Sequence, residues 1–225
     1  MWSGRTTPGR AERLPRVKES MIRVITIERE YGSGGADIAK QLAHRLGWQL
    51  WDQQLTDEIA RQMDCDSSAV EERAEKRDAL HYRLFKAFLR GSFEGSLNAP
   101  RLKMVDADCI REVAERLVTT AAKAGDSVIV GRGSAYYLRD QPDAFHVFIY
   151  APFEAKVARL LEAGKNEEEA IELVETVDRD RSAYIKQYFD IDWPARPFFH
   201  LMINSKIGDE AVVETILCAI ALRNR

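Results

Sequence analysis

Cysteine is scarce in this chain, and neither its cysteines nor its histidines form a metal-binding pattern. The three cysteines, Cys65, Cys109 and Cys218, lie far apart, and the four histidines are equally scattered. Zinc sites need paired Cys or His ligands at short spacing, and small secreted domains need many more cysteines for their disulfides. We therefore expect reduced thiols, no Cys or His metal site and a cytoplasmic location.

Long hydrophobic runs and an excess of positive charge are also missing. No apolar stretch approaches the roughly 20 residues that a membrane-spanning helix needs, so we expect no membrane insertion. The formal net charge is −3, and because residues 1–20 carry five Lys or Arg against two Glu, residues 21–225 carry −6. General nucleic-acid binding depends on many Lys and Arg contacts to phosphates. The acidic body of the chain argues against it.

The first 20 residues show no helical or strand periodicity. They include two prolines and two glycines, so we expect a disordered basic extension over residues 1–20. They lack the apolar core of a secretory signal, whereas a basic transit-like segment and a translation start at Met21 both stay open. The 45% hydrophobic content of the chain suits a single domain over residues 21–225.

A lysine is missing from the most distinctive motif of the chain. That motif is Glu28-Arg29-Glu30-Tyr31-Gly32-Ser33-Gly34-Gly35-Ala36-Asp37. A β-branched run over 22–27 precedes it and an amphipathic pattern follows, so strand, glycine turn and helix come in the order of a phosphate-binding loop. Gly35 stands where such a loop has its Lys, and Asp37 stands where it has Ser or Thr.

We expect this turn to hold the phosphates of a donor nucleotide. Successive backbone N–H groups of such a turn, with the positive end of the helix dipole, favour an anion. The expected donor-phosphate ligands are Gly32, Ser33, Gly34, Gly35 and Ala36. Asp37 would hold Mg²⁺ through a water molecule. The alternative is a glycine turn that joins strand to helix and binds nothing.

Four further strand-like runs alternate with helical patterns. They are Trp48–Trp51, Ser127–Val130, Phe145–Tyr150 and His200–Ile203. Together with 22–27 they predict an α/β fold with a five-stranded parallel sheet, covered by helices on both faces. A helical insertion is expected over about 67–124, and its apolar stripe would suit core packing or a homodimer seam.

Polar residues follow several of these strands, at the edge of a parallel sheet where ligands bind. Arg132 comes directly after the third strand between Gly131 and Gly133, so its guanidinium could grip a phosphate with two hydrogen bonds. Asp52 follows the second strand. We expect Asp52, Gly131 and Arg132 to bind the acceptor substrate. The alternatives are a surface arginine in a flexible turn and an aspartate that caps a helix.

A charged cluster, Asp178-Arg179-Asp180-Arg181, lies toward the end of a helix that begins at Asn166 with a capping box. Arg179 and Arg181 are two residues apart, so they point to different sides of a regular helix. The segment lies between the fourth and fifth strands, where a lid over about 165–193 could close on a substrate. The alternative is a salt-bridged solvent face.

Taken together, these motifs resemble the cytidylate kinase-like family. The glycine turn, Gly131-Arg132 after the third strand and the Asp-Arg-Asp-Arg segment come in the same order in bacterial cytidylate kinases. Residues 25–35 are similar to a divergent branch that has this lysine-free turn, and Asn204-Ser205 fits it too. The resemblance covers about 22–223. Cytidylate kinases proper have the loop Lys, and they have Gly-Arg-Asp where this chain has Gly131-Arg132-Gly133.

The resemblance implies a P-loop kinase fold with a nucleoside-monophosphate region and a lid. It also implies an enzyme with nucleotide substrates that transfers the γ-phosphoryl group of ATP to CMP or a related pyrimidine monophosphate, with Mg²⁺. Because phosphoryl transfer needs cations near the migrating group, Arg29, Arg179 and Arg181 are the candidates for a catalytic role. Arg29 could instead pair with Glu28 or Glu30.

Two other functions stay open on the sequence. One is a non-catalytic nucleotide sensor or partner-binding module, which the missing loop lysine favours. The other is a kinase for a different small metabolite, because one fold hosts many acceptors.

Overall fold

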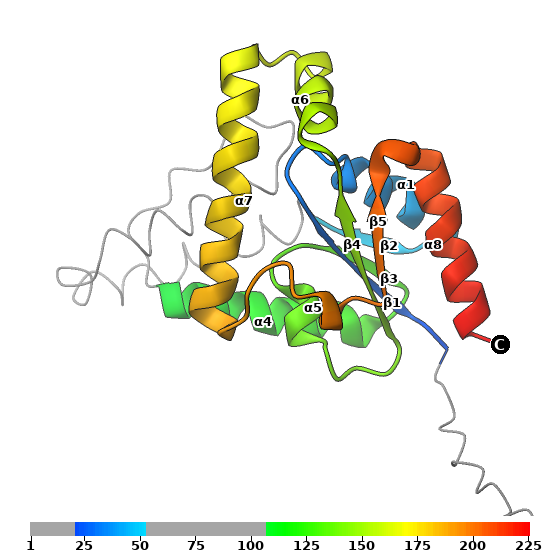
Figure 1. The fold of residues 1–225 in the computed structure, drawn as a ribbon. Coiled ribbons are helices and arrows are strands. Elements are labelled where there is room, and N and C mark those ends of the chain that lie inside the picture. Colours follow the sequence, from blue (N-terminus) through cyan, green and yellow to red (C-terminus); the bar gives the residue numbers. More distant parts are fainter. Residues whose placement is uncertain (1–20, 53–106) are drawn as a thin grey trace, which may run out of the picture.

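Five parallel strands form the centre of the molecule. The computed structural model describes residues 21–52 and 107–225. The strands are β1 (Val24–Arg29), β2 (Gln49–Trp51), β3 (Ser127–Val130), β4 (Ala144–Tyr150) and β5 (Leu201–Asn204). They lie in the order β2-β3-β1-β4-β5, and every neighbouring pair is parallel (Figure 1). The predicted five-stranded parallel sheet is confirmed.

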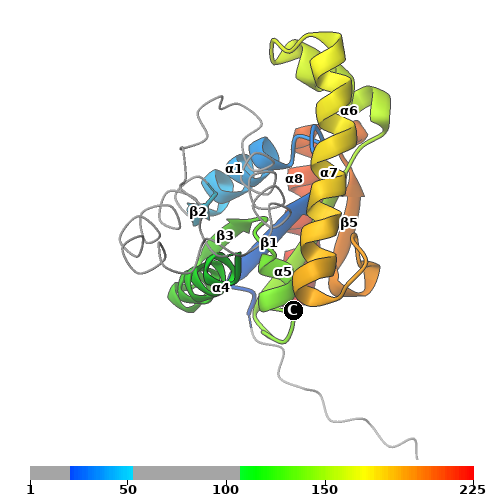
Figure 2. The ribbon, with the colours of Figure 1, turned by 90° about the vertical axis from the view of Figure 1, so that its left-hand side faces the viewer.

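Helices cover both faces of this sheet, as the sequence predicts. One face carries α1 (Gly35–Leu46) and α8 (Asp209–Arg223), and the other carries α4 (Ala107–Ala124), α5 (Ser134–Tyr137) and the C-terminal part of α7 (Glu167–Phe189) (Figure 1, Figure 2). Side chains alternate along β1, so Ile25 and Ile27 pack with α1 and α8 while Val24 packs with α4. A central parallel strand is buried in this way on both sides.

The carboxyl ends of the strands meet at one edge of the sheet, because all five strands run in the same direction. At this edge β1 passes into the glycine turn before α1, β3 passes into Gly131, and β5 passes into the one-turn helix η3 (Ser205–Ile207). Arg29 at the end of β1 is level with Ile149 of β4. The predicted site residues that follow strands therefore share one edge.

A helical hairpin rises from this edge. It consists of α6 (Phe153–Glu162) and α7, and both helices extend beyond the strand ends in Figure 1. Its apolar core contains Tyr31, Leu160, Ala170, Val174 and Val177. Tyr31 belongs to the glycine turn, so the hairpin packs directly against that turn. A short helix, η2 (Arg196–Phe198), lies between α7 and β5.

Helix α7 begins where the sequence predicts and continues further. The Asn166 side chain accepts a hydrogen bond from the Glu169 N–H at 2.8 Å, which confirms the predicted cap. The helix then runs to Phe189, so the cluster 178–181 lies in its middle and not toward its end. Buried Tyr184 continues the inward face of α7 past the charged residues, which keeps this part of the helix packed on the sheet.

Two expected segments fall wholly or partly outside the described residues. These are the extension 1–20 and the part of the insertion before residue 107. Residues 107–124 form α4, which packs on the sheet through residues such as Val113 and Val118. None of the helices in the described ranges combines the length and apolar character that a bilayer crossing requires.

Candidate active site

The glycine turn between β1 and α1 has the geometry of an anion-binding site. Gly32 and Gly34 have φ angles of 75° and 76°, a left-handed conformation that glycine adopts readily. Gly34 is the N-cap of α1, and no side chain caps this helix. The N–H groups of the first helical turn, Gly35 and Ala36 included, therefore lack intrahelical acceptors and suit a phosphate.

Hydrogen bonds from distant parts of the chain hold the turn. Ser33 Oγ donates to the Glu30 carbonyl at 2.8 Å. Ser205 Oγ, just after β5, donates to the Ser33 carbonyl at 2.7 Å. The Tyr31 N–H donates to Asp178 Oδ1 of α7 at 2.8 Å. The turn is thus fixed without a ligand, and such preorganisation lowers the cost of binding.

Two cations from α6 contact this turn, and sequence reasoning missed both. A Cβ atom on Gly32 would lie 3.0 Å from Lys156 Cβ, and a Cβ atom on Gly34 would collide with the Arg159 guanidinium. Glycine at these positions therefore leaves room for α6. The one signal in the sequence is the spacing of Lys156 and Arg159, which are three apart and so share a helix face directly after a strand.

Both of these cations have carboxylate partners. Lys156 Nζ lies 3.1 Å from Glu30 Oε2 and 3.5 Å from Asp178 Oδ2. Arg159 donates two hydrogen bonds to Asp209 at the start of α8, at 2.6 and 2.9 Å. A bidentate pair of this kind matches the geometry that a guanidinium also uses toward phosphate.

Arg29 at the end of β1 is buried, with 2% of its surface exposed. Its Cβ and Cγ lie against Gly35, and its guanidinium reaches Gly131 at the end of β3. Of its acidic neighbours, Glu30 forms an ion pair with Lys156. Arg29 spans the distance between the two predicted substrate loops.

The two candidate arginines of α7 face different sides, as the sequence predicts. Arg181 is buried, and its Nη1 donates to the Arg29 carbonyl at 2.8 Å and to Asp178 Oδ1 at 3.0 Å. Arg179 is exposed. The structure therefore brings Arg181 to the end of β1 and leaves Arg179 on the outer side of the helix.

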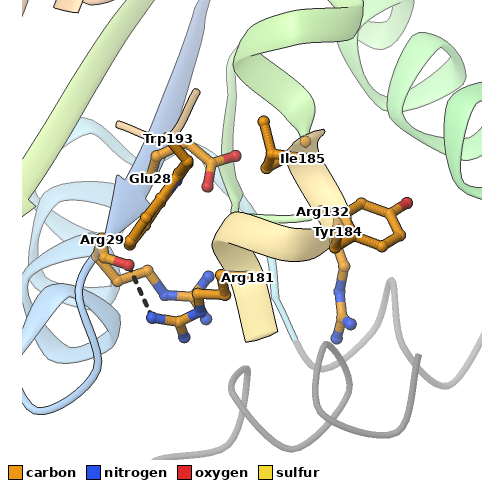
Figure 3. Close-up of a pocket in the computed structure, with 8 residues that line it drawn as sticks. Glu28, Arg29, Arg132, Arg181, Tyr184, Ile185 and Trp193 are labelled. Carbon is orange, nitrogen blue, oxygen red and sulfur yellow. Dashed lines mark hydrogen bonds between the residues drawn. The ribbon is translucent and has the colours of Figure 1, made fainter. Parts of the chain in front are cut away.

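Arg132 lies in a buried pocket rather than on a flexible surface turn. Its side chain is 1% exposed, and its φ angle of 62° continues the left-handed turn that Gly131 begins. The pocket brings together Glu28, Arg29, Arg132, Gly133, Arg181, Tyr184, Ile185 and Trp193 (Figure 3). The guanidinium groups of Arg29 and Arg181 lie together in Figure 3, whereas that of Arg132 points away from them.

Electrostatics also links Asp52 to this pocket. Burial lowers the pKa of Arg132 to about 10, Asp52 opposes the decrease, and the neighbouring charges of Arg29 and Arg181 add to it. Arg132 therefore stays charged at neutral pH. The predicted acceptor residues Asp52, Gly131 and Arg132 gather at the ends of the adjacent strands β2 and β3.

Glu28 is the acidic residue of this arginine pocket, and the sequence analysis gave it no binding role. It is 5% exposed, and its Oε1 atom has no hydrogen-bond partner among the described residues. Burial raises the pKa of Glu28, while the charges of Arg29, Arg181 and Arg132 lower it in part. One carboxylate and three arginines therefore line the pocket.

Asp37 lies in the first turn of α1 and is exposed. Its side chain lines the groove between α1 and α8, near Lys40, His44 and Glu210. The described ranges contain no group of three or more His, Cys, Asp or Glu side chains that could hold a metal ion by itself. Mg²⁺ is commonly bound through one or two carboxylates, water and substrate phosphates, so a site at Asp37 would need further ligands from the nucleotide.

Comparisons with known proteins concern the family and the fold of the chain. Residues 24–207 match the model of the cytidylate kinase-like family. A crystal structure of an uncharacterized protein from Eubacterium ventriosum is 23% identical, with a TM-score of 0.60 over 90% of this chain and 99% of its own. That likeness concerns the fold. No curated protein sequence matches the chain significantly.

Two kinases are more distant in structure. A sugar kinase from Janibacter sp. HTCC2649 is 16% identical, with a TM-score of 0.47 over 90% of this chain and 96% of its own. Shikimate kinase from Acinetobacter baumannii, in complex with shikimate, is 13% identical, with a TM-score of 0.45 over 89% of this chain and 93% of its own.

Proposed function

The chain belongs to the cytidylate kinase-like family, and on that premise we propose that it transfers the γ-phosphoryl group of ATP to CMP or a related pyrimidine monophosphate. Its five-stranded parallel sheet with helices on both faces is the P-loop kinase fold. The proposed enzyme acts in the cytoplasm on nucleotide substrates.

One observation carries the proposal. A glycine turn at the start of α1 lies beside a buried pocket that Arg29, Arg132 and Arg181 line. The turn is suited to the phosphates of a donor, and the three arginines supply positive charge for an anionic acceptor.

On the donor side, the N–H groups of residues 32–36 would hold the ATP phosphates. Arg159 would exchange its bonds to Asp209 for bonds to phosphate oxygens, since it already lies over Gly34. Mg²⁺, when bound, would neutralise charge on the donor phosphates, and Asp37 would hold it through a water molecule.

On the acceptor side, Arg132 would hold the monophosphate, with Asp52 beside it. An oxygen of that phosphate forms the new P–O bond while the bond between the γ-phosphorus and the ADP oxygen breaks. The attacking oxygen is already ionised at neutral pH, so the step needs no general base. Arg29 and Arg181 would stabilise the charge that spreads over the migrating group.

The test is ADP formation from ATP and Mg²⁺ by the full chain, with CMP, dCMP and UMP as acceptors and a reaction without acceptor. We expect acceptor-dependent turnover. Arg132→Lys keeps the charge but loses the two-pronged geometry, so it should raise the KM for the acceptor about tenfold and leave the KM for ATP unchanged.

Arg139→Lys is the matched control, because Arg139 is exposed and pairs with its neighbour Asp140. Equal KM values for the Arg132 variant and the parent would contradict the acceptor role. ATP binding without turnover on any acceptor would favour the nucleotide sensor, which the missing lysine at position 35 supports.

A further inference from the structure

We propose that Arg29 and Gly35 have exchanged the roles that a glycine and a lysine have in an ordinary phosphate-binding loop. The ordinary spacing is G-x-x-x-x-G-K. When Gly34-Gly35 is placed on its Gly-Lys pair, its first glycine falls on position 29. This chain has the cation at 29 and the glycine at 35. The inference rests on the proposed function, because it names the residue that supplies the missing loop charge.

Steric exclusion between the two positions is the first argument. A Cβ atom on Gly35 would lie 2.6 Å from Arg29 Cβ and 2.8 Å from Arg29 Cγ. Carbon atoms in contact lie about 3.5–4.0 Å apart, so no side chain at 35 fits while the stem of Arg29 is present. A lysine at 35 and an arginine at 29 therefore do not fit together. Either one alone can supply the positive charge of the loop.

The backbone of Gly35 offers no other reason for glycine. Its φ angle lies outside the left-handed range, unlike those of Gly32 and Gly34, and it is the first residue of α1. Alanine would normally be preferred over glycine in a helix. What requires glycine at 35 is the side chain of Arg29.

The guanidinium of Arg29 likewise requires a glycine at the end of β3. A Cβ atom on Gly131 would collide with Arg29 Nη1. The arginine therefore runs from the start of α1, where the donor phosphates are expected, to the turn that carries Arg132. Its charge lies between donor and acceptor, where the migrating phosphoryl group would pass.

The position of this cation is fixed by the sheet. Arg29 is the last residue of β1, pairs with Ile149 in the β4 register, and accepts a hydrogen bond from Arg181 through its carbonyl. A loop lysine has a long flexible stem on a turn, whereas Arg29 lies on a central strand and is 2% exposed. The ligand that fits it is an oligophosphate or a phosphoryl group in transfer.

Melting temperatures of single and double variants test the steric exclusion between positions 29 and 35, and they need no enzymatic activity. Gly35→Ala should lower the melting temperature of the parent. In an Arg29→Gly background the same change should raise it or leave it unchanged, so the sign of the effect reverses. Arg29→Met keeps most of the stem, and Gly35→Ala should still destabilise that background. Gly47→Ala is the control, because Gly47 has a φ of 66° and no atom within 4 Å of an added Cβ.

An equal effect of Gly35→Ala in the parent and in Arg29→Gly would overturn the proposal. Gly47→Ala should destabilise both backgrounds alike, since its cost comes from its own backbone.

A binding series tests the exchange of charge, with ATP and inorganic tripolyphosphate as probes and calorimetry as readout. Arg29→Met and Gly35→Lys should each weaken binding about tenfold or more, the first by loss of charge and the second by collision. The double variant Arg29→Gly/Gly35→Lys should recover most of that loss. A double variant that binds no better than the weaker single variant would overturn the exchange.

The binding and turnover experiments distinguish a failure of this inference from a failure of the proposed function. If no acceptor is ever phosphorylated, the proposed kinase reaction fails, while recovered binding in the double variant still supports the exchange. If turnover occurs and Arg29→Met retains both binding and rate, the exchange fails and the kinase reaction stands.

Discussion

His146 is a residue whose environment predicts a measurable dependence of stability on pH. It lies on β4 with 2% of its surface exposed, and its Nδ1 is 2.7 Å from Thr26 Oγ1 of β1. Burial lowers its pKa from 6.5 to about 4, and the nearby His200 adds to the decrease. The folded protein therefore binds this proton more weakly than the unfolded chain does.

This stabilising contribution is fully present above pH 6.5 and is lost as pH falls toward 4. We expect the free energy of unfolding to fall by about 2 kcal/mol between pH 7.5 and 5 on account of His146. His146→Gln removes the titrating group, so urea titrations at the two pH values should show a smaller fall for this variant. His44→Gln on the exposed side of α1 is the control, and a parent-like fall in His146→Gln would contradict the assignment.

At the scale of elements, α7 is joined to the glycine turn through one carboxylate. Asp178 accepts hydrogen bonds from the Tyr31 N–H and from Arg181, and its other oxygen lies 3.5 Å from Lys156 Nζ. It thus connects the turn, α6 and α7. This polar connection adds to the apolar contact of Tyr31 with Val174 and Val177 of the same helix.

We expect Asp178→Asn to lower the free energy of unfolding by about 1–3 kcal/mol, because the amide keeps one acceptor for Tyr31 but loses the charge opposite two cations. Urea denaturation measures this effect. Glu175→Gln, an exposed change on the same helix, should alter stability by less than about 0.5 kcal/mol. Equal small effects of both changes would show that the carboxylate does not join these elements.

Across the whole molecule, the hairpin α6–α7 and the start of α8 meet over the glycine turn. Arg159 joins them, because it lies over Gly34 and forms its bidentate pair with Asp209. If phosphate replaces Asp209 as its partner, ATP binding and the position of the hairpin are coupled. The lid expected over 165–193 then has a physical contact through which a nucleotide acts on it.

We expect Arg159→Gln to weaken ATP binding about tenfold, because a charge-assisted contact to phosphate is lost. Asp209→Asn should leave ATP affinity unchanged or increase it, because the competing carboxylate is gone. Arg45→Gln is the control, since Arg45 of α1 forms an exposed pair with Glu214 of α8, the helix that also carries Asp209. Calorimetric titration with ATP gives all three values, and parent-like affinity in Arg159→Gln would contradict the coupling.

The sequence predicts the sheet because the β-branched runs of a buried parallel strand are local signals, and Ile25, Ile27 and Val130 are members of such runs. It also predicts that Arg179 and Arg181 diverge, since helix periodicity alone determines this. The capping residue Asn166 is equally local. These features depend on neighbours within a few residues in the chain.

The sequence does not show the contacts that complete the site. Lys156 and Arg159 reach the glycine turn because α6 leaves the sheet beside it. No sequence motif near these two residues predicts that contact. In the sequence, Asp178 is one charge in a cluster typical of a solvent-exposed helix face. Its contact with Tyr31 follows only from the position of α7 in the fold. The exclusion between Arg29 and Gly35 likewise needs atomic positions, although both residues lie in a single motif.

The most direct test of the central account follows the γ-phosphate of labelled ATP in the presence of CMP and Mg²⁺. The account predicts that the label appears on the acceptor as its diphosphate, at a rate that Arg29→Met lowers on the order of a hundredfold. Label that stays on ATP, or leaves only as inorganic phosphate while ATP is bound, would contradict it.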